Sequence, residues 1–192
     1  MTGIIILAAG SSSRMGQPKQ LLIYKQTTLL QRAINAAIGT PDSCLVVVLG
    51  ANHQLLMPDA AMLIVEYNPD WQQGMGASIS AGIKRLLAEK PTVQNVLLML
   101  CDQPFADTAL LQKLINAKQN SNDKIIASAY ENTLGAPVLF DRSYFNELLA
   151  LQGQEGAKKL LIKYSNEVIA MPFNKGAIDI DTPEDYERLL NS

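Results

Sequence analysis

The chain places a segment of small and polar residues directly after its first apolar run. This segment, residues 7–22, reads L-A-A-G-S-S-S-R-M-G-Q-P-K-Q-L-L. Its small side chains allow backbone N–H groups to approach an anion, its serine hydroxyls are further donors, and Arg14 and Lys19 add two positive charges. A polyphosphate group requires this combination. The spacing differs from a Walker loop and from a dinucleotide-binding glycine motif, and a solvated surface loop is the alternative interpretation.

Two other segments carry carboxylates at positions suited to a metal ion. Asp102 follows the apolar run 96–101, while Asp179 and Asp181 alternate along an extended stretch near the C-terminus. Mg²⁺ is usually held by one or two carboxylates together with phosphate oxygens and waters. We therefore expect Asp102 and Asp181 to be metal ligands, with Asp179 as the alternative to Asp181. A turn role for Asp102 and a helix-end role for Asp181 are the competing interpretations.

A third segment has the composition of a nucleoside-binding loop. Residues 68–82 read N-P-D-W-Q-Q-G-M-G-A-S-I-S-A-G. Gly74 and Gly76 leave room for a planar base and its ribose, and Ser78 is expected near a helix start with a free hydroxyl. In the alternative interpretation the segment is a plain loop, with Ser78 as a helix cap and Trp71 as a buried anchor.

Short apolar runs alternate with longer amphipathic runs along the chain. Strands are expected at 3–8, 44–49, 62–66, 95–101, 124–129, 136–140 and 167–171. Helices are expected at 27–38, 52–57, 76–89, 106–118, 142–150, 156–164 and 182–190. This alternation predicts an α/β fold with a Rossmann-like, doubly wound, mostly parallel sheet in a single domain over residues 1–192. Such sheets bind ligands beyond the carboxyl ends of their strands, which is where the segments described above lie.

The composition excludes several classes of protein. With 48% hydrophobic and 18% charged residues the chain is not predominantly disordered, and a net charge of −2 argues against a nucleic-acid-binding protein. Cys44 and Cys101 lie in apolar runs and are expected to be reduced and buried, as in a cytoplasmic protein. No apolar run reaches the roughly 18 residues of a membrane span, and the N-terminus lacks the cationic start of a signal peptide.

Four of these segments resemble motifs of one enzyme family. Residues 7–22 match L-A-A-G-x-S-x-R-M-G-x-P-K-x-L-L at every fixed position, and this motif is typical of molybdenum cofactor nucleotidyltransferases, members of the MobA-like NTP transferase superfamily. The Ala-Ala-Gly form resembles the cytidylyltransferase branch. Residues 68–82 resemble N-x-x-W-x-x-G-M-x-x-S-[LI]-x-x-G, and residues 179–186 resemble D-I-D-T-P-E-D-[LY]. Residues 101–104 resemble G-D-Q-P, with Cys101 in place of glycine.

The resemblance implies a Mg²⁺-dependent transfer of CMP from CTP to the phosphate of molybdopterin, with release of pyrophosphate. A molybdoenzyme client is a further partner that it implies. The implied catalytic residues are Arg14, Lys19 and Asp102, and the implied metal ligands are Asp102 and Asp181. The implied nucleotide-binding residues are Leu7, Ala8, Ala9, Gly10, Ser11, Ser12, Ser13, Arg14, Lys19, Gly74 and Ser78.

The acceptor side matches the family less closely. Ala136 stands where G-H-P-V-L-F has histidine, and Gln154 and Lys158 replace the aspartate and arginine of G-D-x-G-A-R. Transfer to a sugar phosphate or an alcohol phosphate is therefore an alternative. A non-catalytic carrier of nucleotide or cofactor is another, although the intact Lys19 and Asp102 favour an enzyme. The sequence contains no dinucleotide-binding motif that would support an oxidoreductase activity.

Overall fold

The computed structural model describes residues 1–56, 63–121, 123–154 and 156–191. Its centre is a seven-stranded sheet with the order β5-β4-β1-β6-β8-β7-β9. The strands are β1 (Thr2–Ala8), β4 (Ser43–Leu49), β5 (Leu63–Tyr67), β6 (Asn95–Leu100), β7 (Ile125–Tyr130), β8 (Thr133–Asp141) and β9 (Val168–Pro172). All neighbouring strands are parallel except that β8 runs antiparallel to both β6 and β7. A separate two-stranded sheet consists of β2 (Ile23–Tyr24) and β3 (Thr27–Thr28).

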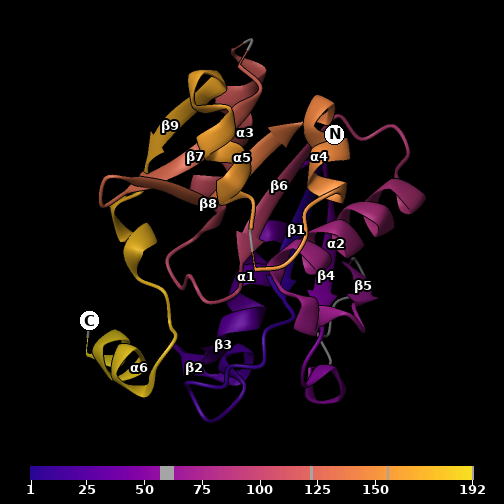
Figure 1. The fold of residues 1–192 in the computed structure, drawn as a ribbon. Coiled ribbons are helices and arrows are strands. Elements are labelled where there is room, and N and C mark those ends of the chain that lie inside the picture. Colours follow the sequence, from indigo (N-terminus) through magenta and orange to yellow (C-terminus); the bar gives the residue numbers. More distant parts are fainter. Residues whose placement is uncertain (57–62, 122, 155, 192) are drawn as a thin grey trace.

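Helices cover both faces of the large sheet (Figure 1). The α-helices are α1 (Leu29–Ile38), α2 (Met75–Glu89), α3 (Thr108–Gln119), α4 (Phe145–Leu149), α5 (Lys158–Lys163) and α6 (Pro183–Leu190). The 3-10 helices are η1 (Lys19–Leu21), η2 (His53–Leu55), η3 (Trp71–Gln73), η4 (Arg142–Tyr144), η5 (Ser165–Glu167) and η6 (Asn174–Ala177). One core joins the sheet to α1 and α3, and the other joins it to α2, α4 and α5.

Strand β1 shows why the sheet is covered on both sides. Ile4 and Ile6 point into the core beneath α1 and α3, whereas Ile5 and Leu7 point into the core beneath α2. These side chains are all buried. Full burial of such a side chain contributes about 1.5–3 kcal/mol relative to exposure, so an apolar strand without alternation is stable only between two helical layers.

The strand register brings the ends of β1 and β6 together. Leu7 pairs with Leu100, and both strands end at the same edge of the sheet. The chain order runs from β1 outward to β4 and β5 and then returns to β6 on the other side of β1. The switch point of the sheet therefore lies between β1 and β6, where α/β proteins of this type bind ligands.

The C-terminal helix α6 packs away from the large sheet, beside β2 and β3 (Figure 1). Ile180 and Leu189 join Met15, Leu22 and other buried side chains in a third, smaller core. The helix begins at a capping box in which Thr182 and Asp185 exchange hydrogen bonds, with proline at the first helical position. This packing brings the side chain of Asp181 beside the loop that follows β1.

The α/β class and the mostly parallel sheet confirm the prediction from the sequence. The segment 136–140 was expected as a strand but not as the antiparallel partner of two neighbours, and β2 and β3 were not predicted. Of the predicted helix 52–57, the described residues form only the 3-10 turn η2, where Asn52 has a left-handed φ of 59°, and residue 57 lies outside them. The helix expected at 142–150 is divided into η4 and α4.

Both cysteines are unpaired and buried, as predicted. Burial, followed by the nearby charge of Asp102, raises the pKa of Cys101 to about 12, so its thiol stays protonated at neutral pH. Among the described helices, none combines the length and the apolar character needed to span a membrane.

Candidate active site

The loop that follows β1 exposes a run of backbone donors. Within the described chain, the N–H groups of residues 10–13 donate no hydrogen bond. Ser12 adopts a left-handed conformation with a φ of 56°, and its carbonyl accepts from the N–H of Met15 at 3.0 Å. The loop thus turns sharply and leaves consecutive N–H groups open to an anion, which is the geometry that favours phosphate binding.

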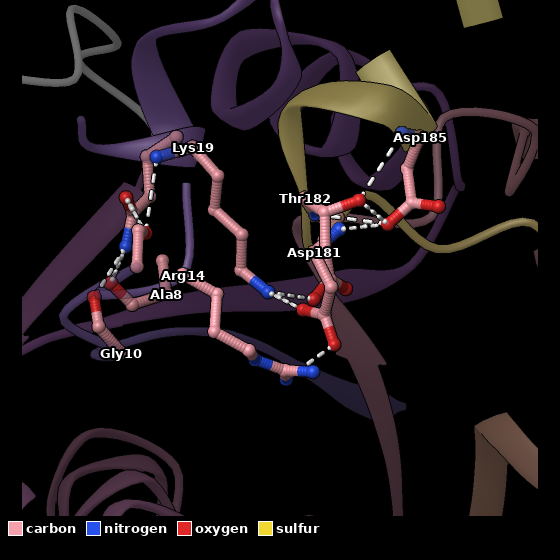
Figure 2. Close-up of polar contacts among 10 residues, drawn as sticks. Ala8, Gly10, Arg14, Lys19, Asp181, Thr182 and Asp185 are labelled. Carbon is pink, nitrogen blue, oxygen red and sulfur yellow. Dashed lines mark hydrogen bonds and ion pairs between the residues drawn. The ribbon is translucent and has the colours of Figure 1, made fainter. Parts of the chain in front are cut away.

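The two predicted cations contact the predicted metal ligands. Figure 2 shows the Nζ atom of Lys19 beside Asp181, at 2.9 Å from Oδ1. The same Nζ atom forms an ion pair with Oδ2 of Asp102. Arg14 reaches the other oxygen of Asp181 at 2.6 Å, although 71% of the Arg14 side chain is exposed. In this structure the lysine therefore lies between the two carboxylates that were predicted to hold a metal ion.

Burial and charge shift the pKa values of these groups in opposite directions. Burial alone would lower the pKa of Lys19, but its ion pairs with Asp102 and Asp181 outweigh burial and raise it well above the ordinary value. Burial would likewise raise the pKa of Asp181, yet the hydrogen bond and charge of Lys19, with the charge of Arg14, lower it. Burial raises the pKa of Asp179, and the neighbouring Asp102 and Asp181 raise it further.

Asp102 has one carboxylate oxygen with no partner. The residue is only 9% exposed, and Oδ1 is buried without a hydrogen bond while Oδ2 contacts Lys19. A buried, unsatisfied carboxylate oxygen is costly in free energy and is a preferred ligand of divalent cations. Asp102 therefore fits a metal ion that completes its shell with phosphate oxygens and waters. No cluster of three or more potential ligands occurs in the described part of the chain.

The predicted nucleoside loop lies opposite the loop after β1. Gly74 precedes α2 with a φ of 110°, and a Cβ atom there would lie 2.3 Å from the carbonyl oxygen of Gly153, so only glycine fits. The hydroxyl oxygen of Ser78 accepts a hydrogen bond from the amide of Asn68 at 3.0 Å, which leaves the Ser78 O–H able to donate. Trp71 is half-buried and packs against the core beneath α2.

These loops enclose a cavity of about 270 Å³. Of the residues predicted to bind nucleotide or metal, nine line it: Leu7, Ala8, Ala9, Gly10, Ser11, Lys19, Gly74, Ser78 and Asp102. Four others do not line it: Ser12, Ser13, Arg14 and Asp181. Arg14 and Asp181 nevertheless belong to the same ion-pair network, through Lys19.

Gln154 lines the same cavity rather than a separate acceptor region. Its loop packs backbone to backbone against the nucleoside loop, with the N–H of Gly76 donating to the carbonyl of Gly153 at 3.1 Å. The replacement of aspartate by Gln154 therefore lies in the same cavity as the predicted nucleotide-binding residues. Ala136 and Lys158 do not line this cavity.

Two polar residues beside the site were not singled out from the sequence. Gln103 is buried and donates to the carbonyls of Ala136 and Gly176, at 3.1 and 3.0 Å. Tyr130 ends β7 at the same edge of the sheet as Asp102, and burial raises its pKa. The position of Tyr130 at a strand end was the available signal, but the sequence does not show which strands are neighbours.

The family model for the MobA-like NTP transferase domain matches residues 4–168. Nicotine blue oxidoreductase of Paenarthrobacter nicotinovorans is 29% identical, over 99% of this chain and 96% of its own length. Molybdenum cofactor cytidylyltransferase of Escherichia coli K12 is 24% identical, over 95% of this chain and 92% of its own length.

Solved structures share the fold of this chain. The crystal structure of Rv0371c from Mycobacterium tuberculosis H37Rv has a TM-score of 0.86 and 30% identity, and the match covers 100% of this chain and 98% of that one. A structure of Rv0371c in complex with manganese has a TM-score of 0.76 and 29% identity, with the same coverage. The cavity at the switch point, the matching family model and this similarity lead to one conclusion: the chain belongs to the MobA-like NTP transferase family and is a nucleotidyltransferase.

Proposed function

We propose that the protein transfers CMP from CTP to the phosphate of a molybdopterin-type cofactor and releases pyrophosphate. One observation carries the proposal. A single cavity combines open backbone N–H groups, the charged Lys19 and the unpartnered oxygen of Asp102. Phosphoryl and nucleotidyl transfer depend mainly on positioning and charge neutralisation, so this set is sufficient without a protein nucleophile.

The loop after β1 would bind the triphosphate. The open N–H groups of Gly10 and Ser11, which line the cavity, would donate to phosphate oxygens, and Lys19 and Arg14 would neutralise negative charge that builds up on the α-phosphate and on pyrophosphate. Both cations now pair with Asp181. Binding of a nucleotide therefore requires them to exchange a carboxylate partner for a phosphate partner.

Asp102 would hold a divalent cation, which we take to be Mg²⁺, together with Asp181 or Asp179. When bound, such an ion would neutralise phosphate charge and orient the triphosphate. Lys19 lies between Asp102 and Asp181. Its movement toward the phosphates would free a carboxylate oxygen of each residue, so the lysine and the metal ion use the two carboxylates alternately.

CTP is the proposed nucleotide because of the Ala-Ala-Gly turn. Ala9 lines the cavity, and its methyl group packs close to Gly50, where an added Cβ atom would lie 2.8 Å from that methyl group and 2.6 Å from the Cβ atom of Trp71. This packing leaves the methyl group little freedom to move aside. A narrowed site suits a single-ring pyrimidine better than a purine.

The acceptor is inferred from the relative named molybdenum cofactor cytidylyltransferase. Another relative is named nicotine blue oxidoreductase, and the departures at Ala136, Gln154 and Lys158 leave room for other phosphorylated acceptors. Because the names of these relatives point to different activities, the acceptor requires a direct test.

The experiment incubates the purified protein with Mg²⁺, each of the four nucleoside triphosphates and molybdopterin, and measures pyrophosphate release. We expect release with CTP and molybdopterin together, and background release when either is omitted. Parallel reactions with sugar phosphates, and with NADH or NADPH and an oxidised dye, test the alternatives. Pyrophosphate release with a nucleoside triphosphate and a sugar phosphate, but not with molybdopterin, would contradict the proposed acceptor. Dye reduction without any pyrophosphate release would contradict it as well.

A further inference from the structure

A fully buried glutamine lies beneath the loop that follows β1. The amide nitrogen of Gln20 donates to the carbonyl oxygens of Ala8 and Gly10, each at 3.0 Å (Figure 2). Its amide oxygen accepts from the hydroxyl of Ser12 at 3.3 Å. Gln20 is 0% exposed, so its side chain serves the loop and does not contact solvent.

These contacts determine which way the peptide groups of the loop face. The carbonyl of Ala9, between the two that Gln20 holds, accepts from the N–H of Ala51 at 3.0 Å. All three carbonyls of residues 8–10 are thus bound inside the protein. Because a trans peptide directs its C=O and N–H to opposite sides, the N–H groups of residues 9–11 point away from these internal partners, and all three residues line the cavity.

We infer that Gln20 is the positioning residue that turns the loop's N–H groups toward the phosphates, an inference that rests on the proposed function. A primary amide is suited to this role because one nitrogen provides two donors for two carbonyls. With both carbonyls held, the peptide groups do not need to reorient when an anion arrives, and such preorganised donors bind developing charge most strongly.

The same network reaches the lysine of the site. The Ser12 hydroxyl, which donates to the amide of Gln20, also accepts from the backbone N–H of Lys19 at 3.0 Å. Gln20 therefore supports both the open N–H groups and the start of the 3-10 helix that carries Lys19. In the sequence motif this position is variable, so the motif gave it no role.

The test measures binding of inorganic pyrophosphate by calorimetry in the presence of Mg²⁺. Gln20→Met keeps the length of the side chain but removes both donors, and we expect at least tenfold weaker binding. Gln17→Met is the matched control, because Gln17 is an exposed glutamine of the same loop, and its affinity should stay within twofold of the wild type. Cytidine, which has no phosphate, should bind both variants as it binds the wild type.

The possible outcomes are distinct. Unchanged pyrophosphate affinity in Gln20→Met would overturn the inference, as would an equal loss of pyrophosphate and cytidine binding, which indicates a merely structural role. Absence of pyrophosphate binding in the wild type would overturn both this inference and the proposed phosphate loop. The expected pyrophosphate result without CTP turnover would support the role of Gln20 while contradicting the proposed function.

A second variant covers failure of Gln20→Met to fold, which its melting curve would reveal. Ser12→Gly is compatible with the left-handed backbone at this position and removes the side chain whose hydroxyl donates to the Gln20 amide oxygen and accepts from the N–H of Lys19. We expect a loss of pyrophosphate affinity of about threefold to fivefold. Unchanged affinity in this variant would contradict the inference.

Discussion

The loop after β1 and the C-terminal segment 177–186 meet through the ion pairs of Arg14 and Lys19 with Asp181, but the two segments are held in different ways. The loop is anchored from beneath by buried groups, including the amide of Gln20 and the side chain of Met15. The side-chain carboxylate of Asp181 is held by the largely buried Lys19 and by the exposed Arg14. The loop is thus prepared for an anion, whereas the C-terminal segment depends on cations that an anionic ligand would also attract.

Two carboxylates of the C-terminal segment make the difference clear. Asp179 and Asp181 are two residues apart, yet the pKa of Asp179 is raised and that of Asp181 is lowered. Asp181 has two cationic partners, while Asp179 is partly desolvated and is repelled by its neighbours Asp102 and Asp181. The neighbouring charges, rather than the residue type, therefore decide the direction in which each carboxyl pKa is shifted.

Loss of the loop's lysine should have the largest effect. We expect Lys19→Ala to lower kcat/KM roughly 10²–10³-fold, because the charge that stabilises the transition state is removed. Arg14→Ala should act in the same direction but less, since its side chain is largely exposed. Steady-state assays of pyrophosphate release measure both. Lys113→Ala on α3, an exposed lysine outside the cavity, is the control, and equal activity of Lys19→Ala and this control would exclude Lys19 from the mechanism.

The second prediction concerns Asp102, which forms an ion pair with Lys19 of the loop. Asp102→Asn is isosteric and should preserve the fold, while the Mg²⁺ concentration for half-maximal activity should rise at least about tenfold because a charged ligand is lost. A Mg²⁺ titration of activity, together with a thermal melt, decides between the two interpretations of Asp102. An unchanged titration with a lowered melting temperature would assign the residue to the turn instead of the metal.

The third prediction sharpens the role of the loop in choosing the base. We expect kcat/KM for CTP to exceed that for GTP by at least about tenfold, equivalent to about 1.4 kcal/mol, with UTP also poor. Ala9→Gly should narrow the difference between CTP and GTP without abolishing CTP use. Competition assays with paired nucleotides measure the ratio. Equal use of CTP and GTP by the wild type would contradict the cytidylyl assignment and leave the nucleotidyltransferase assignment intact.

The smallest effects should be on thermal stability. Replacement of Asp179 and replacement of Asp181 should change Tm in opposite directions. At pH 7 without metal, Asp181→Asn should lower Tm and Asp179→Asn should raise it, each by about 1–4 °C. The lowered pKa of Asp181 stabilises the fold above its unfolded pKa of about 3.9, and this stabilisation is lost as the pH falls through the folded pKa. The raised pKa of Asp179 destabilises the fold at neutral pH, and this penalty disappears below about pH 4.

Melting curves of both variants between pH 3 and pH 8 measure these effects. The curves of the two variants and the wild type should converge at the acid end. Changes of the same sign in both variants at pH 7 would show that the difference between the two carboxylates has another cause.

Much of the fold was predictable from local patterns. Apolar runs without alternation predicted buried strands such as β1, and the Thr182–Pro183 pair predicted the start of α6. The small, donor-rich segment after β1 predicted an anion site for the same reason, since backbone access and charge are local properties. The antiparallel position of β8 was not predictable, because hydrophobic pattern does not encode strand direction.

The sequence by itself determined the α/β class, the candidate phosphate loop and the set of candidate residues, all of which follow from residue types at short spacing. Only the tertiary structure decided which of those residues meet. Lys19 and Asp181 are 162 positions apart and lie at 2.9 Å because a small core around Ile180 brings the C-terminus to the loop. Gln20 gained its role in the same way, since a variable position in the motif became the buried donor for two carbonyls. Long-range packing sets distances, burial and therefore charge states, and no local pattern contains that information.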